Sequence, residues 1–143
     1  MNMKLYIGSD HGGFELKEKV KKHFSGIDWI DQGSFNDESV DYPDIASKLC
    51  SNLLSNNSMI NPTGILICGS GQGMAMKANK FIGIRAALVW NEESTKLSRE
   101  HNNANILCLG GRLIHHDLAI RCIEIFLNTP FAGGRHELRV KKI

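Results

Sequence analysis

The chain has 143 residues, 42% of them hydrophobic and 22% charged, which are ordinary values for one globular domain with its own core. Its formal net charge of +2 excludes a general affinity for nucleic acids and other polyanions. No apolar run reaches the ~20 residues of a membrane span, and the N-terminal residues lack the apolar length of a secretory signal. The four cysteines show no C-x-x-C spacing, a pattern typical of the cytoplasm, where we expect the protein to work.

The first part of the chain predicts two strands and two helices. Leu5–Ile7 is a compact apolar run that predicts a strand, and a polar turn over Ser9–Gly13 follows it. The next residues predict a helix, with Phe14, Leu16, Val20 and Phe24 at helical spacing beside a lysine-rich face. Ile27–Asp31 predicts a short second strand. After a polar loop, Pro43 takes the first-turn position that proline favours in a helix, here running to Leu54.

A polar connection over residues 56–63 leads to the central segment, Gly64 to Met76. Ile65–Ile67 is a continuous apolar run, typical of a strand buried on both faces. Glycines then interrupt the run before a helix that we expect to begin near Ser70. The first turn of such a helix presents unpaired N–H groups and the positive end of the helix dipole. The segment therefore predicts a site for a negatively charged group.

Cys68 lies between this strand and its turn. A thiol beside a helix N-terminus has its pKa lowered from ~8.5 toward neutrality, which would make it a usable base or nucleophile. A free cysteine is otherwise a small buried hydrophobic residue, and most are. Both interpretations remain open from these residues alone.

The second half continues the alternation. Ile84–Trp90 predicts a fourth strand, and Asn91 followed by acidic residues predicts a capped helix ending near residues 101–103. Ile106–Leu109 predicts a fifth strand, which a glycine turn joins to a helix over Asp117–Leu127.

The C-terminal residues 130–143 no longer follow this pattern. They form either a solvated basic tail or a short helix after the glycines at 133 and 134. A helix would place Arg135 and Arg139 one turn apart on one face, where two guanidinium groups can hold one phosphate. Both possibilities stay open.

Strands that alternate with helices predict a parallel sheet, because parallel neighbours need crossover connections. We expect an α/β fold: a three-layer αβα sandwich with a Rossmann-like, doubly wound, five-stranded parallel sheet, all in a single domain of residues 1–143. Ligands of such sheets bind beyond the carboxyl ends of the strands. We expect four polar turns to meet at this edge, namely Ser9–Gly13, Cys68–Gly73, His101–Asn103 and Gly110–Arg112.

Two other site types were weighed. His115 and His116 have no partner at metal-ligand spacing, so no metal site is expected. Gly69 and Gly71 match the start of a dinucleotide fingerprint, but Met74 stands where the third glycine belongs. Glu92 lies about 20 residues further on, where a ribose-binding acid is wanted, so a nucleotide-binding redox or regulatory module remains an alternative.

Seven motifs in the same order together resemble the type B ribose-5-phosphate isomerase family, which also includes the galactose-6-phosphate isomerase subunits. They are Gly8–Phe14, Asp41–Pro43, Ile67–Gly73, Ala78–Lys80, Gly83–Ala86, Ser98–Asn102 and Gly133–Val140, and they span almost the whole chain. The resemblance implies an aldose–ketose isomerase of D-ribose 5-phosphate and D-ribulose 5-phosphate that uses no metal or organic cofactor. It also implies a homodimer or dimer of dimers with sites at the interface. An isomerase of a hexose phosphate, allose or galactose 6-phosphate, is the alternative.

The resemblance further implies roles for individual residues. Cys68 would be the base, and Met74 stands where another branch of the family carries a glutamate base. His101 would open the sugar ring with help from Asp10. Asn102 would lie beside His101, and Tyr42 would bind the substrate. The enediolate would lie against Gly69, Ser70, Gly71, Gln72 and Gly73, and the phosphate would be held by His11, Arg112, Arg135 and Arg139.

Overall fold

The computed structural model describes residues 3–56 and 63–143, so most of the polar connection predicted over 56–63 lies outside the described residues. The strands are β1 (Lys4–Ser9), β2 (Asp28–Asp31), β3 (Gly64–Cys68), β4 (Ala86–Leu88) and β5 (Ile106–Gly110). The helices are α1 (Phe14–His23), α2 (Tyr42–Ser55), α3 (Gln72–Ala78), α4 (Glu92–Glu100), α5 (His116–Asn128) and α6 (Arg135–Val140). None of these helices is long and apolar enough to cross a membrane.

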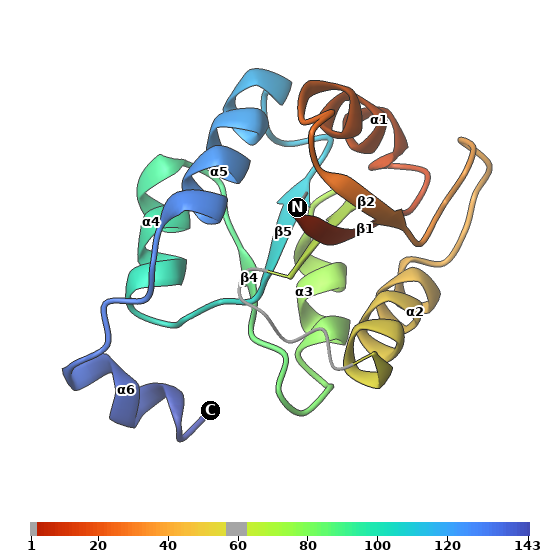
Figure 1. Ribbon diagram of the computed structural model, residues 1–143. Coiled ribbons are helices and arrows are strands. Elements are labelled where there is room, and N and C mark those ends of the chain that lie inside the picture. Colours follow the sequence, from red (N-terminus) through yellow and green to blue (C-terminus); the bar gives the residue numbers. More distant parts are fainter. Residues whose placement is uncertain (1–2, 57–62) are drawn as a thin grey trace.

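The five strands form one parallel sheet in the order β2-β1-β3-β5-β4, which confirms the predicted Rossmann-like α/β sandwich. Two connections, from β1 to β2 and from β4 to β5, run in one direction along this strand order. The connections from β2 to β3 and from β3 to β4 run in the opposite direction. Because parallel crossovers are right-handed, α1 and α4 cover one face and α2 and α3 cover the other. Figure 1 shows this arrangement, with α5 beside α4 and α1.

Alternate strand residues divide the interior into two apolar cores. Ile7, Ile65, Ile67, Leu107 and Leu109 pack with α1 and α5, and Tyr6, Leu66, Cys68, Ile106 and Cys108 pack with α2 and α3. Every residue of β3 is buried, as the continuous apolar run predicts. β3 therefore forms the centre of the sheet, between β1 and β5.

Two elements, α3 and β4, have boundaries that differ from the predictions. α3 begins at Gln72 rather than near Ser70, because Gly71 has a left-handed backbone with φ of 79° that no α-helix contains. β4 covers only Ala86–Leu88, since an edge strand is paired on one side alone. The side chain of Asn79 occupies the other side: its amide donates to the carbonyl of Ala86 and its carbonyl accepts from the Ala86 N–H.

The helix cap at Asn91 follows its prediction, and the structure decides between the two possibilities left open for the tail. Asn91 caps α4, where its side chain accepts a 2.7 Å hydrogen bond from the N–H of Ser94. The tail forms the short helix α6 after Gly133 and Gly134, which have φ of 67° and 55°. Glycine adopts such angles without strain, and the chain thereby changes direction between α5 and α6.

Candidate active site

Three turns meet at the carboxyl edge of the sheet, after β1, β3 and β5, and glycines bring their backbones into contact. A Cβ on Gly13 would overlap the carbonyl of Ile67. A Cβ on Gly110 would lie 2.7 Å from the carbonyl oxygen of Ser70, and one on Gly111 would lie 2.9 Å from that of Gly12. The three turns therefore form one continuous backbone surface that side chains would push apart.

Cys68 ends β3 at this surface. Its side chain is only 4% exposed, and its Sγ accepts a hydrogen bond from the N–H of Gly71 at 3.1 Å. The left-handed backbone of Gly71 turns this amide back onto the sulfur. Cys68 is thus both a buried residue and a polar one, so the two interpretations of the sequence each describe part of its setting.

The other three cysteines, all free and buried, lie elsewhere in the cores. Burial raises the pKa of Cys50 to about 12. Burial is also the main cause that raises the pKa of Cys108 and of Cys122. These thiols therefore stay protonated near neutral pH.

Asp10 and His11 occupy the turn after β1, but their side chains bond to different groups. Oδ1 of Asp10, a residue only 6% exposed, accepts from the N–H of Gly13 at 3.1 Å. Nδ1 of His11 lies 3.3 Å from the backbone nitrogen of Val40, whose N–H donates to it. The ring proton of His11 is therefore assigned to Nε2, which is left as a donor.

Arg112 and Tyr42 lie beside the turn after β3. The backbone N–H of Arg112 donates to the carbonyl of Gly69 at 3.0 Å, and its guanidinium lies over that glycine, 3.5 Å from where a Cβ would stand. The ring of Tyr42 covers Gly73, which has no side chain to displace it. Ser70 Oγ accepts from the N–H of Gln72 at 3.3 Å, inside the same turn.

The prediction that residues 101–103 share this edge is wrong. His101 follows α4 and precedes β5, which begins at Ile106, whereas Cys68 pairs with Gly110 at the other end of β5. A strand of five residues at ~3.3 Å per residue is about 16 Å long. His101 and Asn102 therefore lie at the amino edge, because any residue that leads into a parallel strand does so.

A second cluster forms at this amino edge. The rings of His101 and His136 stack with centroids 4.1 Å apart and planes inclined by 15°. α6 carries His136 between Arg135 and Arg139, and the N–H of Ala132 donates to the carbonyl of Glu100 at 3.1 Å. Loss of water, and then the neighbouring His101 and arginines, lowers the pKa of His136. The sequence motif contained His136, but nothing in its spacing indicated the stack.

The predicted site residues thus separate into two groups within one chain. The carboxyl-edge group contains Asp10, His11, Tyr42, Cys68, Gly69, Ser70, Gly71, Gln72, Gly73 and Arg112. The amino-edge group contains His101, Asn102, Arg135 and Arg139. In Figure 1, α6 lies below α4 at the lower left, away from α1 and the turn before it.

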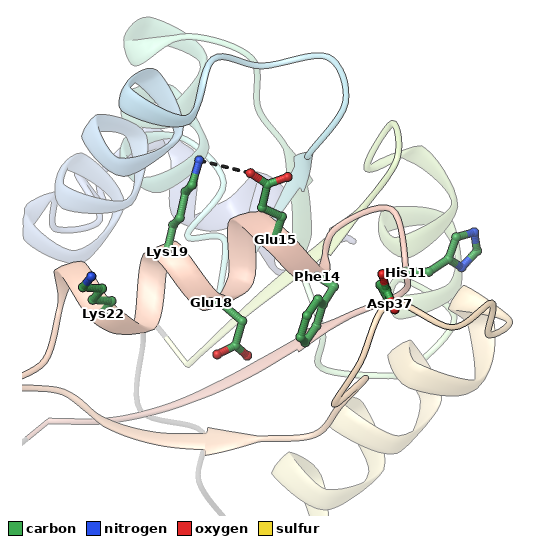
Figure 2. Close-up of a pocket in the computed structure, with 7 residues that line it drawn as sticks. All are labelled: His11, Phe14, Glu15, Glu18, Lys19, Lys22 and Asp37. Atoms are coloured by element: carbon green, nitrogen blue, oxygen red, sulfur yellow. Dashed lines mark ion pairs between the residues drawn. The ribbon is translucent and has the colours of Figure 1, made fainter.

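An open hollow of about 670 Å³ lies along the outer side of α1 and includes His11. Figure 2 shows it, with the imidazole of His11 directed away from the lysines. The other lining residues are Phe14, Glu15, Glu18, Lys19, Lys22 and Asp37. Their charges have both signs, and Lys19 pairs with Glu15 at 3.3 Å, so the lining selects no class of ligand.

The dinucleotide alternative loses its geometric support. β4 is separated from β3 by β5, so Glu92 at the start of α4 does not face the turn after β3. Its carboxylate lies 3.4 Å from the guanidinium of Arg121 on α5. Within residues 3–56 and 63–143, no three His, Cys, Asp or Glu side chains gather closely enough to hold a metal ion.

The doubly wound parallel sheet places the chain among the α/β proteins, a class in which small molecules bind beyond the carboxyl ends of the strands. Residues 5–143 match the family model described as Ribose/Galactose Isomerase, and the chain belongs to that family. It is 39% identical to the ribose-5-phosphate isomerase B of Escherichia coli over 142 residues, covering 98% of this chain and 93% of that one.

Two solved structures are similar over nearly the whole chain. A ribose 5-phosphate isomerase from Thermotoga maritima has a TM-score of 0.92 and 51% identity, with 99% of this chain and 97% of that one covered. Ribose-5-phosphate isomerase B from Mycoplasma genitalium, a structure with bound ribulose-5-phosphate, has a TM-score of 0.90 and 39% identity. The match covers 99% of this chain and 94% of the Mycoplasma genitalium chain.

Proposed function

We propose that the protein interconverts D-ribose 5-phosphate and D-ribulose 5-phosphate, with Cys68 as the base. The observation that carries the proposal is the 3.1 Å bond from the Gly71 N–H to the sulfur, at the end of the central strand. Its supporting context is a family of isomerases and relatives that carry the name ribose-5-phosphate isomerase B. The four free cysteines favour a cytoplasmic location for this activity.

The thiolate of Cys68 takes the proton from C2 of the open-chain aldose, and the electron pair forms the C1–C2 double bond as negative charge moves onto the carbonyl oxygen. The C2 hydroxyl gives its proton to the negatively charged C1 oxygen, the C2–O bond becomes the ketone as the C1–C2 double bond opens, and the Cys68 thiol delivers the abstracted proton to C1. Backbone N–H groups between Gly69 and Gly73 stabilise the enediolate, since charge appears there only during the reaction. Gln72 and Tyr42 enclose this end of the substrate, and Asp10 lies beside it.

The phosphate and the closed sugar ring need residues from both clusters. His11 and Arg112 supply donors at the carboxyl edge, while Arg135, Arg139, Asn102 and the ring-opening acid His101 lie about a strand length away. A second copy of the chain brings its amino-edge cluster to the first copy's turns. We therefore propose a homodimer, alone or paired into a dimer of dimers, with each site completed by the partner and with residues 130–143 contributing phosphate contacts.

Replacing the base tests the chemistry. Cys68→Ala should lower kcat by about 10²–10⁴-fold, the usual contribution of a positioned base, while binding of ribose 5-phosphate persists. Cys50→Ala is the matched control, because that thiol is also buried but its raised pKa leaves it protonated. Substantial isomerase activity in Cys68→Ala would rule out the assigned base.

The family description also supports a second candidate substrate, a hexose 6-phosphate such as allose or galactose 6-phosphate. The same proton transfer between C2 and C1 serves either sugar. Side-by-side kcat/KM values on pentose and hexose phosphates decide between them, and we expect the pentose to be preferred.

A further inference from the structure

Lys17 is fully buried, although it belongs to the lysine-rich helix α1. Its Nζ donates to both carboxylate oxygens of Asp31, at 2.8 and 2.7 Å, and to the carbonyl oxygen of Ser34 at 2.6 Å. The rings of Phe14 and Phe35 lie 5.5 and 5.4 Å from it. A buried ammonium must be paired, so these partners are held in place.

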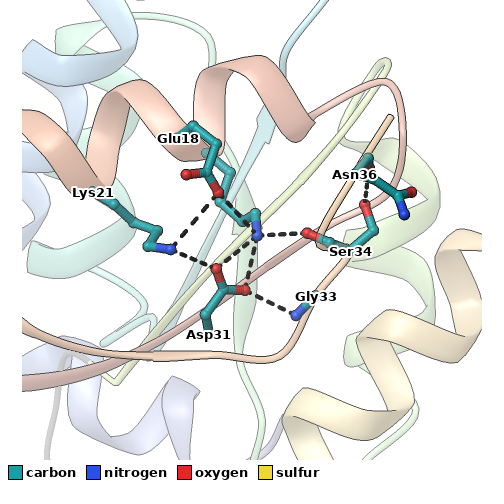
Figure 3. Close-up of polar contacts among 7 residues, drawn as sticks. Glu18, Lys21, Asp31, Gly33, Ser34 and Asn36 are labelled. Carbon is teal, nitrogen blue, oxygen red and sulfur yellow. Dashed lines mark hydrogen bonds and ion pairs between the residues drawn. The ribbon is translucent and has the colours of Figure 1, made fainter. Parts of the chain in front are cut away.

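The Lys17 contacts hold the segment after β2 against α1. Backbone hydrogen bonds join the same segment to the end of β1. Figure 3 shows the bonds, including that from the N–H of Gly33 to Asp31 at 2.9 Å. The N–H of Ser9 donates to the carbonyl of Gly33 at 2.7 Å, and the N–H of Ser34 donates to that of Ser9 at 2.6 Å. Ser9 directly precedes Asp10 and His11, so the segment is anchored beside the site.

Three more hydrogen bonds lie along residues 34–40, and the last of them reaches His11. The Ser34 hydroxyl donates to the carbonyl of Asn36 at 3.1 Å, and the Asn36 side chain accepts from the N–H of Glu38 at 3.0 Å. The N–H of Val40 then donates to Nδ1 of His11. Since Nδ1 accepts this bond, it carries no proton, and Nε2–H is the donor that remains.

We propose that Lys17 is a positioning residue for His11. By holding Ser34 it fixes the loop that presents the Val40 N–H, and this fixes both the orientation of the imidazole and the tautomer with the proton on Nε2. The functional meaning rests on the proposed function, in which Nε2–H of His11 donates to the substrate phosphate. A fixed donor binds the phosphate without first losing side-chain freedom.

Lys21 provides a matched comparison. Its Nζ also lies 2.8 Å from Asp31, but its side chain is 30% exposed, and it approaches from outside. Asp31 therefore keeps a cationic partner and the Gly33 N–H when Lys17 is replaced. What Lys17 supplies and Lys21 does not is the bond to the Ser34 carbonyl.

The experiment compares Lys17→Met with Lys21→Met by two readouts. In Lys17→Met, the ¹⁵N chemical shifts of the His11 ring should move from those of the Nε2–H tautomer toward those of a mixture of tautomers. The KM for ribose 5-phosphate should rise about tenfold, while kcat changes less than twofold. Lys21→Met should resemble the unaltered protein in both. In a His11→Ala background, Lys17→Met should raise KM no further.

Unchanged His11 shifts in Lys17→Met, or an equal rise of KM with and without His11, would overturn the positioning role. Shifted His11 signals with an unchanged KM would support the positioning and refute the phosphate contact proposed for His11, so the two failures are distinct. If Lys17→Met does not fold, Val40→Pro removes the N–H itself. The Val40→Pro variant must then show the same change of His11 tautomer. An unchanged tautomer in that variant would refute the proposal.

Discussion

At the level of single residues, the pairing of Cys68 with the Gly71 amide decides what the turn after β3 can do. A strand brings the sulfur to the edge, and one left-handed glycine directs an N–H at it. The sequence indicated the strand, the glycines and the cysteine. It did not indicate that the helix starts two residues later, because a positive φ at Gly71 is set by the approach of Leu109 and Gly110.

Gly71→Ala should destabilise the protein and lower kcat. The φ of 79° is strained for alanine, and the new Cβ would stand 2.6 Å from Leu88 and 2.8 Å from the backbone of Leu109. We expect a loss of about 1–3 kcal/mol in the free energy of unfolding, measured with a chemical denaturant. Gly26→Ala is the control, because no atom lies within 4 Å of its Cβ position. Equal stability of the two variants would contradict this account of the turn.

At the level of elements, the order and type of the strands β1–β5 and the helices α1–α5 followed from periodicity, caps and turn residues, whereas the sequence left open whether α6 forms. The edge on which residues 101–103 lie was predicted wrongly, although chain direction alone decides it. A segment that leads into a parallel strand lies at the amino edge of the sheet. Lys17 was missed for another reason. Helical spacing places it beside Leu16 and Val20, but its burial depends on the loop after β2, which folds over α1.

Asp31→Ala tests the buried ion pair between α1 and β2. Burial tends to raise the pKa of Asp31, but the bonds from Lys17, Lys21 and the Gly33 N–H outweigh it and hold that pKa below its ordinary value. The charged carboxylate therefore stabilises the fold above its unfolded pKa of about 3.9, and this contribution is lost as the pH falls through the lower pKa of the folded state.

At pH 7, Asp31→Ala should lower the free energy of unfolding by about 3 kcal/mol, because the buried Lys17 ammonium loses its closest carboxylate and keeps only that of Glu18, 3.5 Å away. The difference from the unaltered protein should shrink below about pH 4, where Asp31 itself becomes protonated. Denaturant titrations at several pH values measure both. A deficit that stayed constant down to acid pH would show that the carboxylate charge is not what stabilises this pair.

At the level of the whole molecule, one chain holds the predicted site residues in two groups at opposite edges of its sheet. Neither the motifs nor their spacing revealed this separation, because a linear order of motifs says nothing about which copy of a chain supplies each one. It becomes visible only when strand direction and the position of α6 are known.

Mixing two inactive variants tests whether copies complete each other. Cys68→Ala and His101→Ala proteins, unfolded together and refolded, should regain about a quarter of the unaltered activity, because half of random dimers are hybrids and each hybrid has one intact site. Each variant refolded alone is the control and should stay inactive. Failure to regain activity, with hybrids demonstrated by mass spectrometry, would show that His101 and Cys68 do not serve one shared site.

The glycine contacts among the turns after β1, β3 and β5 also limit how this catalyst can be redesigned. Since each backbone occupies the volume that a side chain of its neighbour would need, a library that randomised Gly12, Gly13, Gly110 or Gly111 would mostly sample misfolded proteins. Altered sugar preference must come instead from groups that stand above this surface, such as Tyr42 and Gln72. Selection for new substrates should therefore enrich changes there and leave the underlying scaffold untouched.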